Sequence, residues 1–133
     1  MQTAEIARQM RDGLLTPDVM SAHCPSRRIL QHVTSRWGTL VLVALAPGTL
    51  RFSDLRRRIG GISERMLAQT LQQLEADGLV HRHAHEVVPP HVEYRLTPLG
   101  RDLVPRLLSL ATWIEDNLAA LLTAATEAKT GEA

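Results

Sequence analysis

Apolar residues recur with helical spacing through the centre of the chain. Leu67, Leu71 and Leu74 are separated by four and three positions, which predicts a helix over 63–77 that Ser63 caps and Gly78 ends. A shorter helix, capped by Ser53, is expected before it and ends at 60–61. Two helices joined by a tight glycine turn, the second longer than the first, are typical of a helix-turn-helix.

The residues after this pair follow a strand-like pattern. Leu79-Val80 and residues 92–96 alternate between apolar and polar positions, and a polar tip over 86–91 separates them. Pro89-Pro90 cannot donate to a strand ladder, so they belong to the turn. The pattern predicts a two-stranded hairpin, a wing, directly after the second helix.

Helices are also expected on both sides of this unit. Upstream, the sequence predicts a short helix over 3–13, a loop over 15–25, a helix capped by Ser26 that runs to about 34, and another from about 37 to 46. Downstream, a long helix is expected to begin at Thr97-Pro98 and to bend at Pro105. A polar, frayed tail is expected beyond Thr123. Its apolar repeat outlasts what one small core can cover, so we expect a second subunit to bury the residues Leu103, Leu107, Leu110, Ile114 and Leu118.

Composition narrows the class of protein. A chain of 133 residues that is 44% hydrophobic and 22% charged is typical of one globular domain. The sequence shows no long uncharged apolar run and no secretory signal pattern, so no membrane association is expected. Cys24 is the single cysteine and cannot form an internal disulfide, which favours a reducing cytoplasm.

Charge is unevenly distributed although the net charge is only +1. Residues 26–106 contain twelve arginines against seven acidic residues, a balance of +5, while the two ends together hold three basic and seven acidic residues, a balance of −4. The arginine fork suits phosphate oxygens and guanine edges. A compositional preference for arginine is the alternative, but a basic centre between acidic ends favours nucleic acid as the partner.

The helix over 63–77 carries the strongest candidates for base contact. Arg65, Gln69 and Gln72 lie opposite its leucines, with Gln73 on the flank. Arg pairs with guanine and Gln with adenine in the major groove, whereas an ordinary solvated face is the alternative. Free N–H groups near Ser63 and Glu64 can take a phosphate, and the alternative is that Glu64 itself occupies this site in the free protein. The full set expected at DNA adds residues before and after this helix: Arg51, Ser63, Arg65, Gln69, Gln72, Gln73, Arg82, His83, His85 and His91.

Histidines are concentrated in the wing. His81, His83 and His85 alternate along one strand and so project to one face. A metal site that also uses Cys24, His23, His32 or His91 is the alternative to a DNA-facing role. Because the chain has no HExxH or CxxC frame, we expect no metal and no cofactor.

Residues 24–113 resemble the HxlR-type winged-helix regulators, relatives of the MarR superfamily. The matching elements are Cys24-Pro25, Arg36-Trp37, Arg51-Phe52-Ser53-Asp54-Leu55, Gly61-Ile62-Ser63, Met66-Leu67, Leu71, Leu74-Glu75, Asp77-Gly78-Leu79-Val80, Arg82, Val88-Pro89-Pro90, Val92-Glu93-Tyr94 and Leu96-Thr97-Pro98-Leu99-Gly100. The chain departs from this pattern at His85 and His91, where aromatic and basic residues are common, and in residues 1–20, which extend beyond the usual start.

The resemblance implies a mainly α (α+β) fold, a winged helix-turn-helix with N- and C-terminal dimerisation helices. The expected organisation is an N-terminal extension over 1–23, a DNA-binding domain over 24–97, a dimerisation helix over 98–124 and a tail over 125–133. It also implies a homodimer that places two recognition helices in successive major grooves of a palindromic double-stranded operator. We therefore expect a cytoplasmic transcriptional regulator, a repressor by preference.

In several members of this family a cysteine at the position of Cys24 senses electrophiles or oxidants. Arg27, Arg28 and the start of the next helix would lower the pKa of this thiol, and the alternative is a small packing residue. A small-molecule effector is the other possible signal. A winged helix that binds protein instead of DNA is the rival function, and an enzyme is not expected because no catalytic constellation converges in the sequence.

Overall fold

The computed structural model describes residues 3–131, and residues 1–2 and 132–133 of the predicted extension and tail lie outside it. Seven helices and three strands follow one another over the described residues. They are α1 (Thr3–Arg11), α2 (Pro25–Val33), α3 (Gly38–Ala44), β1 (Leu50–Arg51), α4 (Phe52–Arg58), α5 (Glu64–Ala76), β2 (Val80–His85), β3 (His91–Leu96), α6 (Pro98–Asp116) and α7 (Leu118–Gly131).

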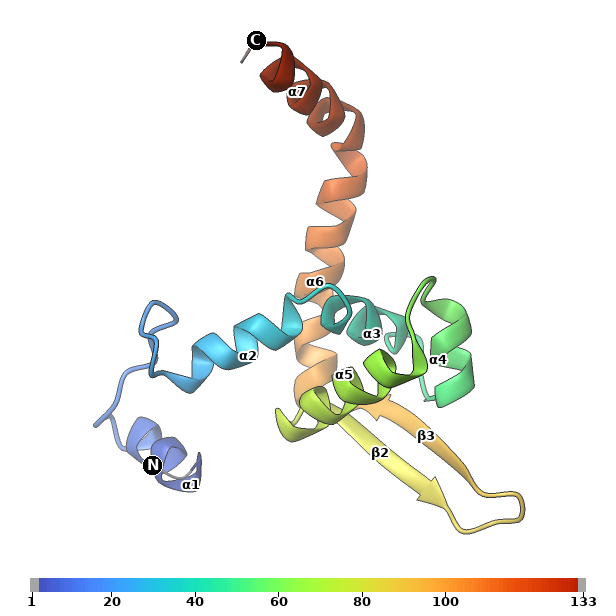
Figure 1. Cartoon of the computed structure of the whole chain (residues 1–133). Coiled ribbons are helices and arrows are strands. Elements are labelled where there is room, and N and C mark those ends of the chain that lie inside the picture. The colour runs from blue at the N-terminus through green and yellow to red at the C-terminus, as the bar shows by residue number, and fades with distance from the viewer. Residues whose placement is uncertain (1–2, 132–133) are drawn as a thin grey trace.

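One hydrophobic core holds α2 to α6 together. The leucine stripe of α5 is buried in it, as the spacing predicted, and Leu42 of α3 and Leu55 of α4 are also fully buried. Figure 1 shows α5 beside α2 and α3, which it contacts, with the β2–β3 hairpin directly after it. The arrangement is a winged helix-turn-helix, which confirms the predicted fold.

The sheet contains one more strand than the sequence predicted. Its order is β1-β3-β2, and both pairings are antiparallel. β1 was missed because two residues, Leu50 and Arg51, are too few to show an alternating pattern. β2 extends to His85, and β3 already begins at His91, so the turn is shorter than predicted.

Two helix starts differ from the prediction. The N-cap of α2 is Cys24 rather than Ser26, because Pro25 fits the first helical position, where no backbone donor is needed. The N-cap of α4 is Arg51 rather than Ser53, and the Asp54 carboxylate accepts a hydrogen bond of 3.1 Å from the Arg51 backbone N–H. The caps at 63 and 97 are confirmed by hydrogen bonds of 3.1 Å to backbone N–H groups.

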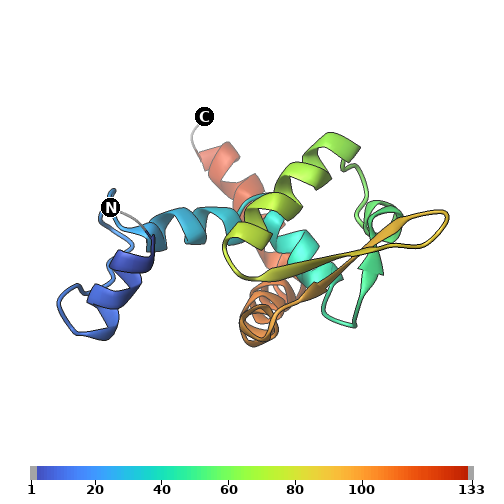
Figure 2. The same ribbon diagram turned by 90° about the horizontal axis from the view of Figure 1, so that it is seen from below.

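The first and last helices stand away from the core. α1 and α7 contain no buried residue, and Figures 1 and 2 show both projecting from the winged unit. α6 runs through Pro105 to Asp116, and the long helix is interrupted at Asn117, a break that the sequence did not predict. α7 remains helical to Gly131, where a frayed tail was expected. No helix within residues 3–131 is long and apolar enough to cross a membrane.

Candidate nucleic-acid interface

The outer face of α5 has the composition that the sequence predicted. Arg65, Gln69 and Gln72 are exposed, whereas Gln73 is half-buried on the flank. Within residues 3–131, no hydrogen bond or ion pair engages the side chains of the first three. The helix therefore presents a guanidinium and two amides that are free to meet an outside partner.

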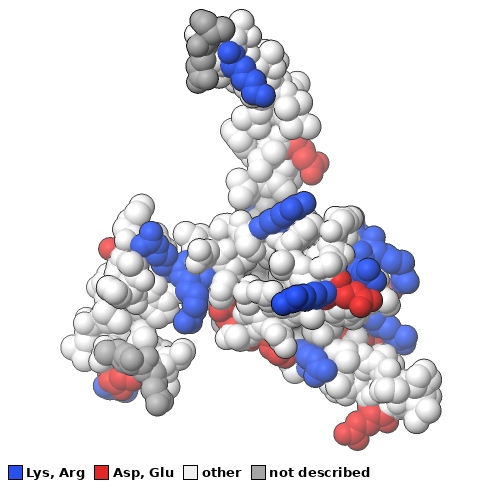
Figure 3. All heavy atoms as spheres, viewed as in Figure 1, with Lys and Arg blue, Asp and Glu red and all other residues white. Residues whose placement is uncertain are grey.

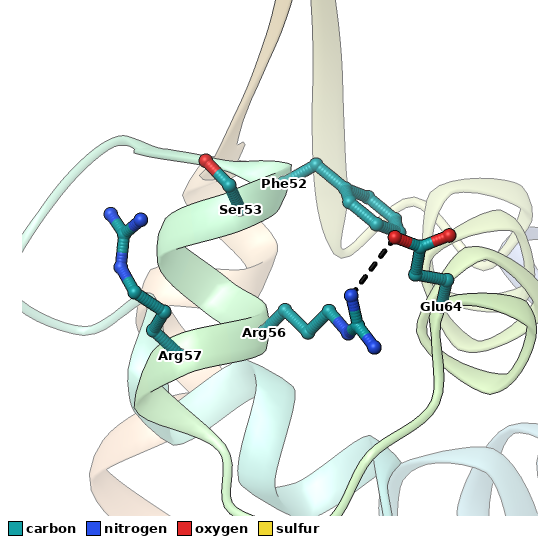
Figure 4. Close-up of a pocket in the computed structure, with 5 residues that line it drawn as sticks. All are labelled: Phe52, Ser53, Arg56, Arg57 and Glu64. Atoms are coloured by element: carbon teal, nitrogen blue, oxygen red, sulfur yellow. Dashed lines mark hydrogen bonds and ion pairs between the residues drawn. The ribbon is translucent and has the colours of Figure 1, made fainter.

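The start of α5 is held by α4. Ile62 is buried, and Gly61 adopts the left-handed conformation (φ 85°) that the tight turn needs. Across this turn Arg56 of α4 donates a hydrogen bond of 2.9 Å to the Glu64 carboxylate in the first turn of α5. Figure 4 shows the pair beside Phe52 at the rim of an open hollow. Glu64 is thus engaged by Arg56, and the Met66 backbone N–H in the first turn of α5 donates to the Ser63 hydroxyl.

Basic side chains gather beside this end of α5. Figure 3 shows them over α4, where Arg56, Arg57 and Arg58 are all exposed. Arg57 is paired with Asp54 at 2.5 Å. Arg58 makes no ion pair within the part of the chain that the structure describes. The α4 surface thus retains positive charge next to the face of α5.

The wing residues expected at DNA lie on both faces of the hairpin. Arg82 pairs with Tyr94, on the face of the hairpin that carries the buried residues Val80 and Leu96. His83 faces Glu93, and His85 faces His91, on the opposite side. Arg82 and the three histidines therefore cannot contact one flat surface together. Arg51 lies at the other edge of the sheet, where β1 pairs with β3.

The histidine face includes an acidic residue that the sequence analysis did not select. Glu93 Oε2 lies 3.0 Å from His85 Nε2, and Glu93 Oε1 lies 3.4 Å from His91 Nε2. The adjacent His85 ring is the main cause of a lowered pKa of the Glu93 carboxyl, while partial desolvation acts in the opposite direction. The hairpin register was the missing signal, because only the pairing of strands brings these residues together.

Cys24 is half-buried at the start of α2. Its sulfur accepts a hydrogen bond of 3.0 Å from the Ser26 hydroxyl. This bond is the main cause of a lowered pKa of the thiol, and the backbone N–H groups of Asp18 and Ser26 add to it. The expected contributions of Arg27 and Arg28 are absent from these causes. The direction of the predicted shift agrees, and the Ser26 backbone N–H at the start of α2 contributes as expected, but the main cause is the Ser26 hydroxyl and not Arg27 or Arg28.

Another polar contact that the sequence did not reveal links α2 to the end of α5. His32 Nδ1 lies 2.6 Å from Asp77 Oδ2, and the Asp77 side chain is only 3% exposed. Since 45 positions separate the two residues, no local pattern could indicate the pair. It holds the C-terminal end of α5 against the helix that Cys24 begins.

The apolar residues of the last two helices divide into two groups. Leu107 is buried in the core of its own subunit and Leu103 packs against that core, so neither is freely available to a partner. Leu110, Ile114 and Leu118 remain 43–49% exposed. Trp113, which the sequence analysis did not select, is 55% exposed beside them.

Comparisons with known proteins agree with this geometry. Residues 32–121 match the family described as HxlR-like helix-turn-helix. The uncharacterised HTH-type transcriptional regulator YtfH of Escherichia coli (strain K12) is 55% identical over 122 residues, which cover 92% of this chain and 94% of that protein.

Solved structures extend the likeness to three dimensions. The transcriptional regulator YtfH of Salmonella typhimurium is similar with a TM-score of 0.79 and 56% identity, covering 84% of this chain and 99% of that one. The redox regulator HypR in its reduced form is similar with a TM-score of 0.69 and 38% identity, covering 74% and 98%. The two YtfH proteins are named as transcriptional regulators, which are not enzymes, and HypR is named as a redox regulator. The chain belongs to the HxlR-like helix-turn-helix family and is a transcriptional regulator.

Proposed function

We propose that the protein binds a palindromic DNA operator as a homodimer and represses transcription by occupying it. The free face of α5, made of Arg65, Gln69 and Gln72, is the observation that carries this proposal. An Arg reads guanine O6 and N7, and a Gln reads adenine N6 and N7, when a helix enters the major groove. As a regulator of this kind it acts in the cytoplasm, with the DNA.

Contacts to phosphate position α5 in this proposal. We expect a DNA phosphate to bind at the N-terminus of α5, beside the exposed Ser63 and the first backbone N–H groups of the helix. Arg58 and Arg51 supply charge from α4 and the sheet edge. The wing follows the DNA backbone with either Arg82 or the histidine face, because the two lie on opposite sides of the hairpin.

The decisive experiment selects DNA fragments with the purified protein and then measures affinity by fluorescence anisotropy. Arg65→Ala and Gln69→Ala should each weaken binding to the selected operator by about 1–3 kcal/mol, the usual size of a lost base contact. Arg106→Ala is the matched control, since Arg106 is also an exposed arginine but lies on α6. Thermal stability should stay unchanged in all three variants because the side chains face solvent.

The same titration separates this proposal from a protein-binding winged helix. A dimer that uses several arginines per subunit releases many counterions, so its affinity should fall about 10³-fold or more between 50 and 200 mM salt. If no fragment is selected, or if both α5 variants bind as tightly as wild type, then α5 is not the recognition helix. An increase in reporter expression when the gene is deleted would support repression, and a decrease would contradict it.

We further propose that Cys24 makes operator binding sensitive to electrophiles or oxidants. The thiol has a lowered pKa and borders a hollow lined also by Leu15, Asp18 and Arg28. Thiolate is the reactive form of cysteine. The similarity to a redox regulator supports the same function. Treatment with diamide or a quinone should lower operator affinity, and Cys24→Ser should bind DNA but ignore the treatment. If complete modification of the thiol leaves binding unchanged, then Cys24 is a packing residue and an effector must bind elsewhere.

A further inference from the structure

Three potential metal ligands converge on the histidine face of the wing. His85 comes from the end of β2, and His91 and Glu93 come from β3. One ligand atom from each of the three lies within 4.8 Å of the other two. All three side chains are half-buried, so the cluster is shielded from solvent and yet open to an ion.

Two separations in the cluster, each to a different oxygen of Glu93, are close to those around a small metal ion. Ligands bound at about 2.0–2.1 Å in a tetrahedral arrangement lie about 3.3–3.4 Å from one another. The Glu93 oxygens lie 3.0 Å from His85 Nε2 and 3.4 Å from His91 Nε2. The imidazole rings of His85 and His91 have their centroids 4.4 Å apart and are tilted by 30°. An ion could therefore be accommodated by rotating side chains, without moving either strand.

One nitrogen of the cluster has no satisfactory partner. His85 Nε2 is buried and makes no well-formed hydrogen bond among the described residues, and its near neighbour is the Glu93 carboxylate, with Oε2 at 3.0 Å. A buried polar atom without a partner is uncommon in a native protein and calls for an explanation. A neutral imidazole nitrogen offers its lone pair to a metal ion, which would satisfy it.

We propose that His85, His91 and Glu93 form a binding site for a divalent transition-metal ion of the zinc class, with water as the remaining ligand. Two imidazoles and one carboxylate suit Zn²⁺, whereas Mg²⁺ and Ca²⁺ prefer oxygen ligands alone. No metal was expected from the sequence, because ligands spaced six and two residues apart on a hairpin match no established frame. Since the ligands come from both strands, the bound ion joins β2 to β3 at the last pair before the turn.

The test measures Zn²⁺ binding by isothermal titration calorimetry in the full chain without DNA. Cys24→Ser serves as the background, so that the thiol cannot contribute. We expect one ion per chain with micromolar or tighter affinity. His85→Gln, His91→Gln and Glu93→Gln should each weaken binding at least about tenfold. The matched control is His81→Gln, which removes an exposed imidazole from the same strand and face but outside the cluster, and should bind as the background does.

Co²⁺ provides a second readout of the same site. Bound Co²⁺ should give the visible absorption bands of a tetrahedral site with nitrogen and oxygen ligands. The bands should be the same in wild-type protein and in Cys24→Ser. Several results would overturn the proposal: no binding in the micromolar range, binding that survives all three substitutions in folded protein, or binding that requires Cys24 or His81. Circular dichroism checks folding of each variant. Because no DNA is present, failure here leaves the proposed operator binding intact, and failure to find an operator leaves the metal site intact.

Discussion

The reactivity of Cys24 depends on one neighbouring hydroxyl. The Ser26 side chain donates to the sulfur and stabilises the thiolate, which lowers the pKa of the thiol. A lower pKa means more thiolate at neutral pH, so the pH profile of alkylation should lie below that of an ordinary thiol. Ser26→Ala should move the profile of iodoacetamide reaction to higher pH. Arg27→Ala should leave it in place, and a larger shift from Arg27→Ala than from Ser26→Ala would show that the helix charges control the thiol.

Gly100 is required for steric reasons in the first turns of α6. A Cβ atom there would lie 2.2 Å from the backbone oxygen of Leu79, far inside contact distance. On helix propensity alone, Gly100→Ala would stabilise the chain by about 1 kcal/mol. We expect the opposite sign, a loss of about 1–3 kcal/mol in the free energy of unfolding, because backbone must move. Urea denaturation measures this free energy. Gly60→Ala is the control that should be tolerated, because a Cβ atom added at the exposed Gly60 would meet no atom within 4 Å.

Single residues were predictable where their signal is local. The caps at Ser63 and Thr97 and the free face around Arg65 follow from neighbouring positions on one helix, and the structure contains them as expected. Glu93 was not predictable, because its role depends on which strands pair and in what register. The burial of Leu107 likewise depends on how far the core extends along α6.

At the scale of elements, the contact between α2 and α5 connects the helix that Cys24 begins with the helix that carries Arg65, Gln69 and Gln72. His32 lies near the end of α2, the helix that Cys24 begins, and it contacts Asp77 at the end of α5. A change at Cys24 that moves α2 would therefore reach α5, the proposed recognition helix, through this pair. Long helices were well predicted from periodicity, but this connection between them could not be.

The His32–Asp77 pair should be important for stability. His32→Leu leaves the almost fully buried Asp77 carboxylate without its partner, which should reduce the free energy of unfolding by about 1–3 kcal/mol. Asp77→Asn should cost less, because the amide can still form a hydrogen bond to the ring. Urea denaturation at neutral pH gives both values. Equal stability of His32→Leu and wild type would mean that solvent replaces the imidazole without penalty.

At the scale of the whole molecule, the exposed apolar residues indicate a missing contact surface. Leu110, Ile114 and Leu118 follow one another at spacings of four along α6 and into α7, and Trp113 lies beside them. A contiguous apolar face of this kind is typical of an interface between subunits. α1 and α7 have no buried residue within the described chain, and both helices extend away from the winged unit (Figure 1). We therefore still predict a homodimer, but we expect its interface to be formed by the exposed Leu110, Ile114 and Leu118 and not by the buried Leu107.

This assignment can be tested by separating dimerisation from folding. Leu110→Glu and Ile114→Glu place a charge on the exposed face, so they should yield folded monomers with weakened operator binding, because only one half-site can be held at a time. Leu107→Ala should behave differently: the dimer persists, but the free energy of unfolding falls by about 2–5 kcal/mol, as for other leucines truncated in a core. Sedimentation velocity at micromolar concentration and urea denaturation give the two readouts. Wild-type protein that sediments as a monomer, or glutamate variants that remain dimeric, would place the interface elsewhere or exclude the homodimer.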